Sequence, residues 1–149
     1  MACSLRPHED KFAFSAVFEL DDAGKIYKEW YGKTVIHSDR RYTYEEAQEI
    51  LEGKPGDHEA ILRKIDVLAK IYRKQRLKQG ALSIESEEMR FKLNEEGNPD
   101  GVVIKTSKDA HKLIEEFMLL ANRKVAEFLS PKKKEKANFP MIYRVHDTP

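Results

Sequence analysis

An alternation of apolar residues near the start of the chain is the feature that most limits its fold. Residues 11–20, KFAFSAVFEL, have period 2, which is the signature of a β-strand with one face at least half-buried. That face would carry Phe12, Phe14, Ala16, Phe18 and Leu20. Turn-forming residues follow at 21–24, and a second alternating run spans 26–36, with Gly32 as a candidate β-bulge. The two runs therefore predict an antiparallel hairpin.

Helix signals follow this hairpin. Thr43 and Glu46 have the spacing of a capping box, which predicts a short helix that ends at about Leu51. Two glycines and a proline at 53–57 separate it from the next element. Residues 58–78 predict a long amphipathic helix with a marked excess of basic side chains. Its apolar positions, spaced by three or four, are Ile61, Ile65, Leu68 and Tyr72.

The second half of the chain repeats this order of strands and helix. Alternating runs at 89–93 and 102–106 flank a polar turn and predict a second hairpin. Ser107 is the expected N-cap of a helix that reaches about Leu129, and 141–145, MIYRV, predicts one more strand. The predicted fold class is α+β, with antiparallel hairpins packed against two long amphipathic helices.

Length and composition limit the class of protein. A chain of 149 residues suits one domain, and its formal charge of +1 gives no overall attraction for nucleic acid. Cys3 is the only cysteine and cannot form an internal disulfide, so we expect a reducing, cytoplasmic location. No apolar run approaches the roughly 20 residues needed to span a bilayer. Both ends lie next to predicted strands, so we expect residues 1–149 to be one fragment truncated at both ends.

The sequence shows no catalytic centre of its own. Metal-dependent phosphodiester hydrolysis needs converging carboxylates, but the only adjacent aspartates, Asp21 and Asp22, occupy a predicted turn. The five histidines have neither the spacing of a metal site nor a second thiol to complete a zinc set. Glycine-rich phosphate loops and nucleophile elbows are also absent from the sequence. We therefore predict no catalytic residue and no metal ligand in this chain.

Two adjacent glutamates interrupt the apolar pattern of the helix that follows Ser107. A helical projection puts Glu116 on the flank that holds Lys112, which predicts a solvent-edge salt bridge. Glu115 instead belongs to a polar stripe that comprises His111, Glu115 and Asn122. Two interpretations of Glu115 remain open, a solvated or structural carboxylate and one that accepts a hydrogen bond from a ligand hydroxyl.

Several segments together resemble one family, the ribonuclease II and ribonuclease R exoribonucleases, and specifically its ribonuclease R branch. They include CSLRPHEDK at 3–11, SDRRYTY at 38–44, ALSIESEEMRF at 81–91, DAHKLIEEFMLLAN at 109–122 and YRVHDTP at 143–149. The resemblance implies an internal piece of an RNB catalytic domain. It also implies a processive parent enzyme that degrades single-stranded RNA from the 3′ end to mononucleotides. The Mg²⁺ site of such an enzyme would lie in an aspartate cluster before Cys3, and a catalytic arginine would follow Pro149.

The resemblance also assigns roles to individual residues. Tyr44 and Glu115 are similar to family residues that contact ribose near the RNA 3′ end, where a 2′-hydroxyl distinguishes RNA from DNA. Ile84 stands where some members have a phenylalanine that stacks on the terminal base. Asn122 joins the candidate RNA-binding set from the polar stripe of its helix. An isolated fragment would then be inactive, and its exposed strand edges would allow dimerisation. The alternative is a non-catalytic α+β module that binds nucleic acid or protein through helix 58–78.

Overall fold

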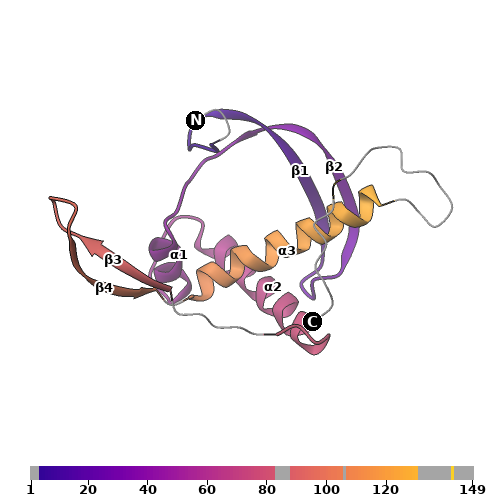
Figure 1. The fold of residues 1–149 in the computed structure, drawn as a ribbon. Coiled ribbons are helices and arrows are strands. Elements are labelled where there is room, and N and C mark those ends of the chain that lie inside the picture. Colours follow the sequence, from indigo (N-terminus) through magenta and orange to yellow (C-terminus); the bar gives the residue numbers. More distant parts are fainter. Residues whose placement is uncertain (1–3, 83–87, 106, 131–141, 143–149) are drawn as a thin grey trace.

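The computed structural model describes residues 4–82, 88–105, 107–130 and 142. The elements (Figure 1) are β1 (Asp10–Leu20), β2 (Ile26–His37), α1 (Tyr44–Leu51), α2 (Glu59–Lys78), β3 (Glu88–Leu93), β4 (Pro99–Lys105) and α3 (Asp109–Leu129). The α+β prediction is confirmed, with two antiparallel hairpins and two long helices, to which α1 adds a short third. Ile84 lies outside the described residues, as does the predicted strand 141–145 apart from Ile142.

The β1–β2 hairpin has the predicted turn. The Asp21 carboxylate accepts hydrogen bonds from the backbone N–H groups of Ala23, at 3.0 Å, and Lys25, at 2.8 Å. Gly24 has a φ of 80°, which a residue with a Cβ rarely adopts. The bulge predicted at Gly32 is wrong, because the register shifts between Glu19 and Leu20. Gly32 has a different reason to be small, since a Cβ there would lie 2.5 Å from the Trp30 ring.

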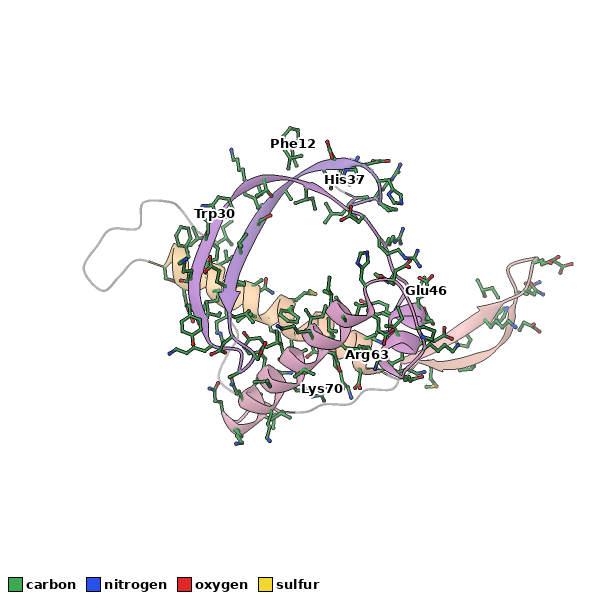
Figure 2. The ribbon with its side chains drawn as sticks, turned by 180° about the vertical axis from the view of Figure 1, so that it is seen from behind. Phe12, Trp30, His37, Glu46, Arg63 and Lys70 are labelled. Atoms are coloured by element: carbon green, nitrogen blue, oxygen red, sulfur yellow. The ribbon has the colours of Figure 1, made fainter. Side chains whose placement is uncertain are left out.

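The hairpin arches away from the helices, so its outer face is not covered (Figures 1 and 2). Phe12 is 92% exposed and points outward from the arch, and Phe14 is exposed beside it. The prediction of a half-buried face is therefore wrong for this part of β1. Phe18, nearer the turn, is half-buried and contacts the Tyr31 ring edge-on, with ring centroids 6.1 Å apart. On this face of β1, only the part near the turn is covered, because that part lies close to the helices.

Contacts with α2 and α3 hold the turn half of the hairpin. The Tyr72 hydroxyl donates a buried hydrogen bond to the Gly24 carbonyl, at 2.8 Å, and burial raises the pKa of that hydroxyl. Tyr31 stacks on Phe128 with ring centroids 4.5 Å apart. The Lys124 ammonium lies 3.2 Å from the Glu29 carboxylate. The hairpin is therefore fixed at one end, which explains how the other end can stand clear of the helices.

The apolar core lies between the three helices. Its buried side chains are Ile50 from α1, Leu68, Ala69 and Tyr72 from α2, and Ala110, Leu113 and Leu120 from α3. The predicted apolar face of α2 is therefore confirmed at Leu68 and Tyr72 but not at Ile61, which is exposed at the start of the helix. The second hairpin projects beyond the end of α1 (Figure 1). In the part of the chain that the structure describes, no helix has the length and apolarity to cross a bilayer.

Candidate nucleic-acid interface

The predicted capping box places Tyr44 at the first position of α1. The Thr43 hydroxyl accepts a hydrogen bond from the Glu46 N–H at 3.1 Å, and the Glu46 carboxylate accepts one from the Thr43 N–H at 2.8 Å. The bond from the Thr43 N–H is the main reason that the pKa of Glu46 lies below its usual value, and the Arg40 guanidinium lowers it further. These reciprocal bonds fix the start of the helix and hence the backbone that carries Tyr44.

Tyr44 meets the first turn of α3 through an aromatic stack. Its ring lies 4.0 Å from the His111 ring, centroid to centroid, and the two planes differ by 8°. One turn farther along α1, the Gln48 side-chain oxygen accepts a buried hydrogen bond from the Ala110 N–H at 3.0 Å. The N-terminal ends of α1 and α3 are thus joined at two neighbouring points.

The predicted N-cap of α3, Ser107, is wrong. The helix begins at Asp109, its N-cap is Lys108 rather than Ser107, and no side chain of the N-cap binds the first turn. The N–H groups of a first helical turn have no acceptor within their own helix, and Gln48 supplies one from another helix. The capping residue was therefore not visible in the sequence next to α3.

The adjacent glutamates of α3 have opposite environments. Glu116 is 4% exposed, and both of its oxygens lie 3.2 Å from Nε of Arg76 in α2. The predicted solvent-edge position of Glu116 is therefore wrong. The Glu115 side chain is 54% exposed, and one of its oxygens is 3.4 Å from Nη2 of the same arginine. The hydrogen bond to Glu116 raises the pKa of Arg76. Arg76 is therefore a cation beside the Glu115 carboxylate.

The structure brings two of the predicted site residues to the same end of α3. Glu115 follows His111 by one helical turn, and His111 contacts Tyr44. Asn122 is exposed but lies seven residues beyond Glu115, roughly 10 Å along the helix axis. Asn122 is thus farther from the Tyr44 end, and Ile84 lies outside the described residues. The arrangement offers a phenol and an exposed carboxylate on neighbouring elements.

An apolar cavity of about 340 Å³ lies beside Tyr44, between α1, α2 and α3. Leu51, Leu62, Leu113 and Ile114 contribute to its wall. Tyr44 belongs to the same wall and also stacks on His111. The neighbourhood of Tyr44 therefore has room for a bound group.

Several basic side chains of α2 are paired with acids. Arg63 and Lys70, labelled in Figure 2, pair with Glu59 and Asp66 within their own helix. Lys64 reaches Asp22 in the hairpin turn, and Arg76 reaches the two glutamates of α3. At least four basic residues of this helix therefore have acidic partners. This matching reduces the positive charge that α2 could present to a nucleic acid or an acidic protein.

Two residues of this site, Gln48 and Arg76, were missed in the sequence. Gln48 follows Tyr44 by four positions and therefore shares its face of α1, which is a weak signal. Arg76 was counted only as part of a basic run. Nothing near it in the sequence indicates the carboxylate forty positions away. Among the described residues, no group of three or more histidine, cysteine, aspartate or glutamate side chains could hold a metal ion.

Comparison with known proteins gives matches along the whole chain. Residues 1–149 match the RNB domain family. DIS3-like exonuclease 2 of Schizosaccharomyces pombe is 42% identical over 144 residues, which cover 86% of this chain and 16% of that protein. Ribonuclease R of Aquifex aeolicus is 33% identical over 153 residues, which cover 99% of this chain and 21% of that protein.

The fold is also that of a solved ribonuclease R. The enzyme of Mycoplasma genitalium, in complex with ribose-methylated single-stranded RNA, matches with a TM-score of 0.77 and 25% identity. The match covers 86% of this chain and 21% of that structure. The chain thus spans about a fifth of the length of the relatives that it matches. Its full-length match and its sequence identity to these relatives show that the chain belongs to the RNB domain family.

Proposed function

We propose that this chain is part of a processive 3′→5′ exoribonuclease that degrades single-stranded RNA to mononucleotides. Its relatives are named as exonucleases and ribonucleases. The ribonuclease R of Mycoplasma genitalium has been solved with single-stranded RNA and with double-stranded RNA. These names support an exonuclease that acts on RNA, and the family resemblance adds the direction, from the 3′ end. Within that enzyme, we assign to the present chain the recognition of ribose near the 3′ end.

The observation that carries this assignment is the contact of Tyr44 with His111, one helical turn from Glu115. A ribose 2′-hydroxyl can donate to a carboxylate and accept from a phenol. Tyr44 supplies the phenol from the start of α1, and Glu115 supplies an exposed carboxylate from α3. A deoxyribose would leave both groups without this partner, so the pair would favour RNA over DNA. By the family resemblance Ile84 would meet the terminal base, and Asn122, farther along α3, would be a further contact with the RNA.

We place the metal chemistry elsewhere in the parent protein. The family resemblance implies Mg²⁺, but the described residues do not offer the cluster of acidic ligands that such a site requires. We therefore assign no step through the metal to these residues, and its aspartate ligands would precede Cys3 in the parent chain. The fragment alone would bind the substrate end without cleaving it. We expect the parent protein to act in the cytoplasm.

A non-catalytic module that binds through α2 is less well supported. That function requires an excess of unmatched positive charge on one face of the helix. The ion pairs of Arg63, Lys64, Lys70 and Arg76 reduce this excess. The paired charges therefore weigh against the interaction module.

The test uses the full-length protein and two matched oligonucleotides that differ only in 2′-hydroxyls at the 3′ end. We expect Glu115→Ala to lower the ratio of kcat/KM for the ribose over the deoxyribose substrate by about tenfold or more, because a hydrogen bond to a charged group is lost. Tyr44→Phe should lower the same ratio by a smaller factor. Glu127→Ala, an exposed glutamate near the far end of α3, is the matched control and should leave it unchanged. Equal ratios in all three variants would refute the proposed recognition.

A further inference from the structure

The Tyr44 side chain is positioned by α3 as well as by its own helix. Its own backbone is fixed by the capping box, but Tyr44 is 42% exposed and lines the cavity between the helices. A side chain in such a place can adopt more than one rotamer unless a neighbour holds it. The His111 ring covers one face of Tyr44 at 4.0 Å and within 8° of parallel. This stack fixes the plane of the phenol and so limits the directions in which its hydroxyl can point.

A second contact fixes His111 relative to Tyr44. Gln48 is one turn from Tyr44, and its side-chain oxygen binds the N–H of Ala110, the residue before His111. The Gln48 side-chain N–H group also donates a hydrogen bond to Glu52 at 2.9 Å. With its nitrogen held by Glu52, the amide turns its oxygen toward α3. The two helix ends therefore cannot rotate past one another without breaking a buried hydrogen bond. The stack is held by the backbone of α3 and not only by the two rings.

His111 is also the link between the two proposed ribose ligands. Residues four apart lie on the same side of a helix, so Glu115 is the neighbour of His111 on α3, roughly 6 Å along the axis. We propose that His111 is a positioning residue that holds the Tyr44 hydroxyl beside Glu115 and so sets the preference for ribose over deoxyribose. This inference rests on the proposed function. His111 itself need not touch the RNA.

The test is a mutant cycle in the full-length protein, with the same matched ribose and deoxyribose oligonucleotides. His111→Leu removes the flat ring but leaves a side chain of similar size, and we expect the ribose preference in kcat/KM to fall by roughly three- to tenfold. His111→Phe restores a flat ring and should stay within about twofold of the natural protein. The double variant Tyr44→Phe/His111→Leu should be no less selective than Tyr44→Phe alone, because the hydroxyl to be positioned is already gone.

A spectroscopic measurement reports the stack independently of activity. With 3-fluorotyrosine at position 44, His111→Leu should shift the fluorine resonance, since a ring no longer lies against that face. His111→Phe should shift it less. If His111→Leu does not fold, His111→Asn takes its place in both measurements, since it also removes the ring.

The possible results separate the two claims. The positioning role is refuted if Tyr44→Phe lowers the ribose preference but His111→Leu does not. It is also refuted if His111→Leu slows the ribose and deoxyribose substrates equally. In both cases the proposed function stands. If Tyr44→Phe and Glu115→Ala both leave the preference unchanged, the proposed function fails and the inference fails with it. A fall with His111→Leu, its recovery with His111→Phe and no further fall in the double variant support the inference.

Discussion

The ion pair between Arg76 and Glu116 gives the strongest prediction about stability. Glu116 is 4% exposed and accepts hydrogen bonds from Nε of Arg76 at 3.2 Å to each oxygen. The Arg76 side chain is 32% exposed and also reaches Glu115. Removal of the arginine would leave a buried carboxylate without its cation, whereas removal of the carboxylate would leave a cation that still has Glu115 and water. The two single variants should therefore differ in cost.

The magnitudes follow from this difference in burial. Breaking a buried pair by removing one partner costs about 3–5 kcal/mol. We expect Arg76→Met to cost about 3 kcal/mol, at the lower end, because water reaches part of the arginine. Glu116→Gln should cost roughly 1–2 kcal/mol, since an amide of the same shape keeps part of the hydrogen bonding. The double variant should cost less than the sum of the two, with a coupling of about 1–3 kcal/mol.

The measurement is denaturant unfolding of the 149-residue chain, followed by the circular dichroism of its helices. Glu115→Gln is the control, because this exposed neighbour contacts the same arginine and should cost less than about 1 kcal/mol. The reasoning is refuted if Arg76→Met costs no more than Glu115→Gln. Additive costs in the double variant would also contradict it, since they would mean that the two side chains do not interact.

Two further predictions concern the α1 cap and the placement of catalysis. Hydrogen bonding lowers the pKa of Glu46 in the folded chain. The ionised carboxylate therefore stabilises the fold, and this contribution is complete above the unfolded pKa of about 4.3. It is lost as the pH falls through the lower pKa of the folded chain. The stability advantage of the natural chain over Glu46→Gln, measured by denaturant unfolding, should therefore shrink on acidification, and a constant advantage would contradict this assignment. The purified 149-residue chain should release no nucleotides from single-stranded RNA in the presence of Mg²⁺, and turnover that follows the fragment through purification would show that the metal ligands lie within it.

Elements specified by neighbouring residues were predictable. The β1–β2 hairpin was predicted from its alternation and turn residues, and the α1 cap was predicted from Thr43 and Glu46. Each of these signals acts over a few positions, because a turn or a cap satisfies backbone groups next to it. The family was also predictable, since its motifs lie in order along the chain.

Errors arose where the outcome depended on a distant element. Alternation showed that β1 has two faces but could not show that the hairpin arches away and leaves Phe12 exposed. Ser107 had the chemistry of a cap, yet the side chain that accepts a hydrogen bond from the start of α3 is Gln48. In both cases the deciding neighbour lies far away in sequence and close in space.

The adjacent glutamates of α3 separate what the sequence determines from what the tertiary structure decides. The sequence determined that Glu115 and Glu116 project from different flanks of one helix, because each residue turns by about 100°. Only the tertiary structure decided which flank is buried, since α2 brings Arg76 to Glu116 from forty positions away. The same packing exposes Glu115 and stacks His111 on Tyr44. The physical reason is that a local pattern sets the direction of a side chain, while burial and charge pairing depend on what the rest of the chain places in that direction.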